Sequence, residues 1–160
     1  MTGTVVEAGR AKGFWPGGLG YAAVPLLLGQ IPGIAAFTLN ANAAVDIGLT
    51  EVPVPAWVFA VVWTIIYPCM GLAAWQLRRD VPGPAAAVPL AVLVAGFLQT
   101  MLFWLSDSLR AVAVADATGV LLAGTTVWVF SRYSRAATAW LLPWLLWMPV
   151  TLAIKIAVLV

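Results

Sequence analysis

Five long apolar segments follow one another along the chain, separated by short runs that hold nearly all the charge. In a helix, which rises about 1.5 Å per residue, each segment is long enough to cross a hydrocarbon core of about 30 Å. Turn formers and charges fill the short connections, so neighbouring helices should be antiparallel. We therefore predict an all-α integral membrane protein, with an N-terminal segment at residues 1–17 and one five-helix domain at 18–160. The predicted helices cover residues 19–45, 55–77, 84–105, 111–130 and 137–160.

The first connection, at residues 46–54, differs from the others. It carries Asp46 and Glu51, contains Pro53 and has no positive charge. Only this connection is long enough to fold over a binding pocket, since the others are tight turns. We expect it to act as a lid.

The distribution of cationic residues predicts the orientation of the chain in the membrane. One side has Arg110 alone, and the cytoplasmic side of a membrane protein usually carries the excess of Lys and Arg. The opposite side holds Arg10, Lys12, Arg78, Arg79, Arg132 and Arg135. The N-terminus should therefore be cytoplasmic and the C-terminus outside. The first segment also resembles a secretion signal ending near Ala41, but it is too long for one and is interrupted by Pro25 and Pro32.

Composition then limits the chemistry that such a bundle can perform. Of the 160 residues, 63% are apolar and 9% are charged, and the sequence contains no His and a single Cys, Cys69. Without His and with one thiol, the usual metal ligands and nucleophilic pairs are missing, so we expect no metal site. The net charge of +2 is explained by the residues that flank the helices, so no nucleic-acid surface is expected either.

Large aromatic residues recur at helical spacing in the second segment. Phe59, Trp63, Tyr67 and Met70 fall within an arc of about 80° on a helix, whereas Trp57 lies on a different side. A helix that only faces lipid needs no such stripe. The second helix should therefore carry a binding face.

A second stripe follows the fifth segment, again within an arc of about 80°. It comprises Trp140, Trp144, Trp147, Thr151 and Lys155. Trp140 suits an interfacial belt. For Trp63, Trp144 and Trp147 we favour a pocket over simple packing between helices, because indole N–H groups prefer a partner.

Polar residues within the apolar segments gather toward the outer leaflet. Asp116 and Lys155 lie at similar depths in two antiparallel helices, and Gln99 lies in the outer half of the third. A charge at such depth costs about 2.5 to 3.5 kcal/mol without a partner or a cavity, so a functional role is the first hypothesis. The alternatives are that Asp116 and Lys155 pair only to hold two helices together, or that Lys155 reaches the headgroups alone.

The second segment also resembles a known family. Its pattern P-x-W-x-F-x-x-x-W-x-x-x-Y-x-x-M-G-x-A-x-W, from Pro55 to Trp75, is similar to that of the TspO/MBR family, the tryptophan-rich sensory proteins related to the mitochondrial translocator protein. Further similarity lies at Ala115-Asp116 in the fourth segment and at Pro143-Trp144-Leu145-Leu146-Trp147 in the fifth. The resemblance covers about residues 53–155 and implies a five-helix bundle. It departs from the family at Lys155, where an Asn is usual, and at Gln99, where an Asn-x-x-Trp pattern is lost.

The resemblance implies a pocket for flat hydrophobic molecules such as porphyrins or sterols. We therefore expect a membrane-embedded binding or sensory protein that requires no cofactor but can hold a tetrapyrrole, with Lys155 as the partner of a ligand carboxylate. The expected ligand-binding residues are Trp57, Phe59, Trp63, Tyr67, Gln99, Asp116, Trp144, Trp147, Thr151 and Lys155.

The alternative is an enzyme on the same scaffold that uses Asp116 as a general acid or base on an isoprenoid or polycyclic lipid, which we favour less than binding. We expect lipid as a partner, a bacterial membrane as the location, and a homodimer through small residues of the third and fourth segments. Those residues are Ala91, Ala95, Gly119, Ala123 and Gly124.

Overall fold

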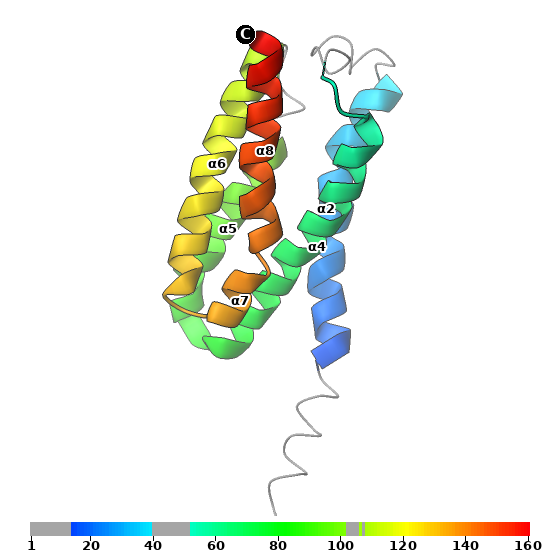
Figure 1. Cartoon of the computed structure of the whole chain (residues 1–160). Coiled ribbons are helices and arrows are strands. Elements are labelled where there is room, and N and C mark those ends of the chain that lie inside the picture. The colour runs from blue at the N-terminus through cyan, green and yellow to red at the C-terminus, as the bar shows by residue number, and fades with distance from the viewer. Residues whose placement is uncertain (1–13, 40–51, 102–105, 107) are drawn as a thin grey trace, which may run out of the picture.

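The computed structural model describes residues 14–39, 52–101, 106 and 108–160, and this part of the chain is helical apart from short turns (Figure 1). Five of its helical stretches are long and apolar enough to cross a membrane, which confirms the predicted five-helix fold class. The elements are α2 (Phe14–Leu39), α4 (Ala56–Asp80), the short 3-10 helix η2 (Gly83–Ala86), α5 (Ala87–Thr100), α6 (Leu109–Ser131), α7 (Arg135–Ala139) and α8 (Leu142–Leu159).

The first and third spans depart from the predicted helix bounds. Helix α2 includes residues 14–17, which the prediction assigned to the N-terminal segment. The third span opens as η2, with Pro84 in its first turn, and continues as α5. The predicted lid lies largely outside the described residues, which resume at Val52.

The fifth predicted span, residues 137–160, corresponds to the candidate membrane span Arg135–Leu159, but its helix is divided. The chain forms α7 and then α8, separated by a turn at Trp140 and Leu141. Pro143 explains the break, because it cannot donate a backbone hydrogen bond to Ala139 and is tolerated only in the first turn of a new helix. Trp140 therefore precedes α8 and does not continue the stripe of Trp144, Trp147, Thr151 and Lys155.

The helices form two groups that meet at one end of the molecule (Figure 1). In one group α2 packs along α4, and Gly71 lets the backbones approach so closely that an added Cβ would collide with the Tyr21 carbonyl oxygen. In the other group α6 packs between α5 and α8. The short helix α7 contacts α4 and thereby joins the two groups.

Apolar side chains cover much of the outside of the bundle. Leu121, Leu146 and Val114 are among the exposed large hydrophobic residues. Such a surface would be unstable in water and matches the hydrocarbon core of a bilayer. The protein is therefore an integral, multi-pass membrane protein.

Candidate functional site

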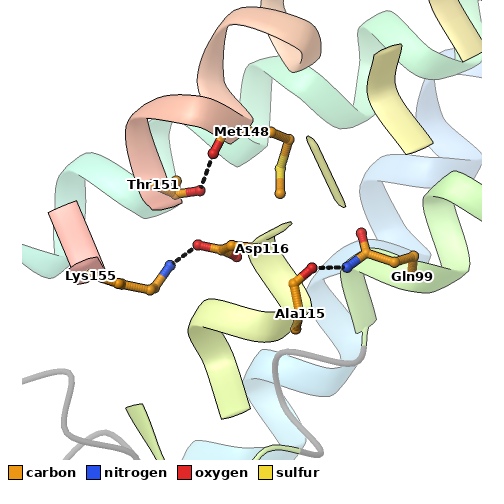
Figure 2. Close-up of polar contacts among 6 residues, drawn as sticks. All are labelled: Gln99, Ala115, Asp116, Met148, Thr151 and Lys155. Atoms are coloured by element: carbon orange, nitrogen blue, oxygen red, sulfur yellow. Dashed lines mark hydrogen bonds and ion pairs between the residues drawn. The ribbon is translucent and has the colours of Figure 1, made fainter. Parts of the chain in front are cut away.

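A buried ion pair joins α6 to α8 (Figure 2). The Lys155 ammonium donates to Asp116 Oδ2, and the two side chains are only 1% and 9% exposed. Asp116 lies two turns after Ser108, whose side chain caps the start of α6, and Lys155 lies one turn before the end of α8. Since the helices are antiparallel neighbours, these positions come to the same depth. Of the two structural alternatives, pairing is the one observed, and Lys155 does not reach out alone.

Helix α4 reaches the ion pair through an aromatic ring. The centroid of Phe59 lies 5.8 Å from Lys155 Nζ, within the range in which an aromatic face attracts a cation. The same ring meets Trp147 of α8 edge to face, with centroids 5.7 Å apart. Two residues of the predicted stripes, one from each helix, are thus in direct contact beside the buried charges.

Gln99 reaches the same region from α5. Its Nε2 donates to the backbone oxygen of Ala115, the residue before Asp116, at 2.5 Å (Figure 2). Its Oε1 is buried without a hydrogen-bond partner among the described residues. Gly119 of α6 makes room for this oxygen, because an added Cβ would lie 2.9 Å from it.

Thr151 lies on the buried face of α8, one turn before Lys155. Its hydroxyl donates to the Met148 carbonyl oxygen at 2.9 Å (Figure 2), and the residue is 2% exposed. This local bond satisfies the donor within the helix. Thr151 therefore lies beside the ion pair, but its hydroxyl group donates its hydrogen bond to the backbone of its own helix.

A second aromatic group links α4 to α5. Tyr67 stacks on Trp63 with centroids 5.0 Å apart and meets Phe97 edge to face at 5.6 Å. The Tyr67 hydroxyl lies 3.4 Å from Thr100 Oγ1. Phe97 and Thr100 were not predicted. Their spacing of three residues on one face of the third helix was the available signal.

Trp144 lies deeper than the other aromatic residues of the site. It is 1% exposed and belongs to the hydrophobic core, and an added Cβ at Gly96 of α5 would collide with its ring. This role of Gly96 was not predicted. The indole nitrogens of Trp144 and Trp147 are both buried without a partner among the described residues. Buried polar groups are nearly always hydrogen-bonded, so these two donors are the exceptions to explain.

The structure does not bring all predicted site residues together. Trp57 is 67% exposed, on a side of α4 away from the stripe of Phe59 and Trp63. The predicted lid, residues 46–54, lies largely outside the described residues. Within the described part of the chain, no cluster of three or more His, Cys, Asp or Glu could hold a metal ion.

The site therefore combines two components with different chemistry. One is a compensated ion pair at the contact of α6 with α8. The other is a set of aromatic faces from α4, α5 and α8, together with two indole donors and one amide oxygen that have no partner in the part of the chain that the structure describes. Aromatic faces stack on flat apolar molecules, and the unpaired groups can hydrogen-bond a carbonyl, a hydroxyl or a ring nitrogen.

Comparison with known proteins identifies the family to which this arrangement belongs. Residues 22–160 match the family model described as the TspO/MBR family. Searches of curated proteins and of solved structures found no match. The matched region includes most of α2 and all of α4, α5, α6 and α8. Since the match covers nearly the whole chain and the observed helices are of membrane-spanning length, the protein belongs to the TspO/MBR family.

Proposed function

We propose that the protein is a membrane-embedded binding or sensory protein that holds a flat, polycyclic hydrophobic ligand, such as a tetrapyrrole or a sterol-like lipid. Family membership supports a sensory, ligand-binding role in the membrane. The observation that carries the proposal is the aromatic contact between α4 and α8, where Phe59 meets Trp147 while Trp63 and Tyr67 extend the aromatic face along α4. Aromatic faces attract flat ring systems in offset or edge contacts.

The unpaired buried polar atoms support a ligand over packing alone. Trp144 Nε1, Trp147 Nε1 and Gln99 Oε1 offer two donors and one acceptor within the bundle. Leaving such groups unpaired costs about 1–3 kcal/mol each. A ligand with an acceptor and a donor on an apolar frame would compensate part of that cost.

Lys155 plays a different part in this proposal from the one expected from the sequence. Asp116 already compensates the charge of Lys155, so a ligand carboxylate that joined the pair would add a negative charge, and one that displaced Asp116 would break a buried pair at a cost of about 3–5 kcal/mol. We therefore assign the affinity to the aromatic residues. The ion pair holds α6 against α8 and keeps the wall of the site neutral.

The competing hypothesis makes Asp116 a general acid or base on a lipophilic substrate. A catalytic carboxyl group must reach the proton that it moves. Here Asp116 is held by Lys155 and is only 9% exposed, an arrangement that favours the binding proposal. Recovery of an isoprenoid or polycyclic lipid unchanged after incubation would agree with binding, and turnover lost in Asp116→Asn would establish the enzyme.

Ligand binding can be tested with purified protein in detergent micelles, titrated with protoporphyrin while tryptophan fluorescence is followed. Saturable quenching is expected, and Trp147→Leu should weaken affinity about tenfold, which corresponds to about 1.4 kcal/mol. Trp140→Phe is the matched control, because Trp140 lies in the turn before α8 and outside the aromatic group. Quenching that never saturates, or that Trp140→Phe weakens as much as Trp147→Leu, would refute the proposed site.

We also propose that the N-terminus is cytoplasmic and that the protein forms a homodimer. The arginines at the ends of α4 and α6 support the orientation. For the dimer, Ala91, Ala95 and Gly124 remain available on the outside, whereas Gly119 and Ala123 are buried within the protein. A mass of one chain in light scattering would refute the dimer, and a cysteine introduced at Arg110 that is labelled from the cytoplasm would refute the orientation.

A further inference from the structure

Helices α4 and α6 end beside α7 at one end of the molecule (Figure 1). Four exposed arginines lie at these helix ends. Two come from the last turn of α4, and two flank the turn between α6 and α7. We call this group the basic end, and it comprises Arg78, Arg79, Arg132 and Arg135. On the described residues, the opposite end of the bundle carries Arg110 at the start of α6.

In the described part of the chain, one acidic residue, Asp80, lies within the basic end, and both of its carboxylate oxygens accept hydrogen bonds. Asp80 Oδ1 accepts a hydrogen bond from Gln76 Nε2 at 2.9 Å, and Oδ2 accepts one from Ser134 Oγ. Ser134 also caps α7 by accepting from Ala137 N at 3.0 Å. These bonds tie the end of α4 to the start of α7. Among the described residues, the basic end therefore holds more arginine than acidic side chains.

Arg132 is held over a ring that faces outward. Its guanidinium lies 4.2 Å from the ring centroid of Trp128, which is 58% exposed on α6. Arg79 lies over Trp75 in a similar way, at 4.7 Å. A guanidinium stacked on an aromatic face still presents N–H groups along its edge, in the geometry that phosphate oxygens accept. Stacking therefore prepares Arg132 for an anion.

An apolar surface continues from Trp128 toward the middle of the membrane. Leu121, two turns earlier on α6, lies on the same side of the helix and is 71% exposed. A molecule with a phosphate at Arg132 and a hydrocarbon chain along Trp128 and Leu121 would match both parts of this surface. A soluble phosphate compound would use only the first part.

We propose that the basic end binds an anionic phospholipid, with the headgroup phosphodiester at Arg132 and one acyl chain along Trp128 and Leu121 of α6. The neighbouring arginines supply attraction to the net negative charge that separates such a lipid from a zwitterionic one. This site is separate from the aromatic site and does not rest on the proposed function.

The test compares phosphatidylglycerol with phosphatidylcholine of identical chains, added to the full-length protein in neutral detergent. Native mass spectrometry counts the bound lipids, and thermal unfolding followed by circular dichroism measures their effect. Phosphatidylglycerol should bind about tenfold more tightly and raise the melting temperature more than phosphatidylcholine does. Equal binding of the two lipids would overturn the proposal.

Variants of exposed residues then locate the site without disturbing the core. Arg132→Gln should lower the preference for phosphatidylglycerol about tenfold, and Trp128→Leu should lower it less, since the apolar surface remains. Arg110→Gln is the matched control, because it removes one exposed arginine from the other end. An equal loss in Arg110→Gln would mean that only diffuse charge is involved, which contradicts a site at Arg132.

Soluble glycerophosphate separates a lipid site from a phosphate site. It carries the phosphate but no acyl chain, so it should not displace phosphatidylglycerol at equal concentration. Displacement at equal concentration would show that the apolar surface of α6 contributes nothing, and would replace the lipid with a small phosphate ligand.

Discussion

The two ends of this bundle each contain an aspartate that helps to join helices, but they treat charge in opposite ways. Asp116 is buried and pairs with Lys155, which compensates its charge. Asp80 is exposed, accepts hydrogen bonds from the neutral groups of Gln76 and Ser134, and lies among four arginines. Water and headgroups can screen the excess charge of the basic end, whereas the apolar interior cannot screen an unpaired ion.

Lys155→Met should produce the largest effect, and it tests the buried ion pair. It leaves Asp116 without a partner, and we expect a loss of about 3–5 kcal/mol in the free energy of unfolding. Denaturant unfolding in detergent micelles measures this loss. The double variant Lys155→Met/Asp116→Leu should recover most of it, because no lone charge remains. A single variant as stable as the wild type would contradict the structural role of the pair.

Gly96→Ala tests how closely α5 packs against Trp144 of α8. The new Cβ would collide with the Trp144 ring, and overpacking of this kind costs about 1–3 kcal/mol. Gly20→Ala is the control, because Gly20 is an exposed residue of α2 where an added Cβ meets nothing within 4 Å and helix propensity alone favours Ala by about 1 kcal/mol. The melting temperature should fall for Gly96→Ala and stay or rise for Gly20→Ala. Equal changes would disprove the packing difference.

Two matched ligands test whether the buried ion pair takes part in ligand binding. Protoporphyrin carries two carboxylates, and its dimethyl ester carries none. Because Asp116 already neutralises Lys155, the ester should bind the aromatic site at least about tenfold more tightly, or by about 1.4 kcal/mol. Fluorescence titration with each compound shows which of the two binds with the higher affinity. Tighter binding of the diacid would restore Lys155 as the partner of a ligand carboxylate, and no binding of either compound would refute the proposed function itself.

Asp80→Asn should produce the smallest effect. Asn keeps an oxygen that can accept from Ser134, and interactions of exposed charged groups are usually worth less than about 1 kcal/mol. The loss in unfolding free energy should therefore be several times smaller than that of Lys155→Met in the same assay. A loss of similar size would show that the contact between α4 and α7 is as critical as the buried pair.

The sequence allowed only part of the site to be predicted. Helical spacing predicts Phe59, Trp63 and Tyr67 on one side of the second helix, since the spacing of residues within a helix is local information, and in the structure Tyr67 stacks on Trp63 while Phe59 meets Trp147. It did not predict that Phe97 and Thr100 would contact Tyr67, or that Trp144 would pack against Gly96. Those contacts depend on how α5 is rotated and how far it lies from its neighbours, which no single segment specifies.

The fifth span illustrates the same limit within one segment. Its hydrophobicity predicts a single helix, yet Pro143 begins a new one and leaves Trp140 in a turn. The missing N–H of proline was visible in the sequence, but a proline inside a membrane segment either kinks a helix or divides it. Contacts with neighbouring elements, such as that of α7 with α4, decide between the two outcomes.

The sequence by itself determined the five membrane spans, the gathering of arginines at one end and the aromatic stripe of the second helix. These properties follow from hydrophobicity and helical periodicity, which act on each segment alone. Tertiary structure decided that Asp116 and Lys155 pair, that Phe59 lies beside that pair and that Trp57 faces outward. Burial makes an isolated charge so unfavourable that a partner is required, but only the packing of α4, α6 and α8 specifies which atoms meet.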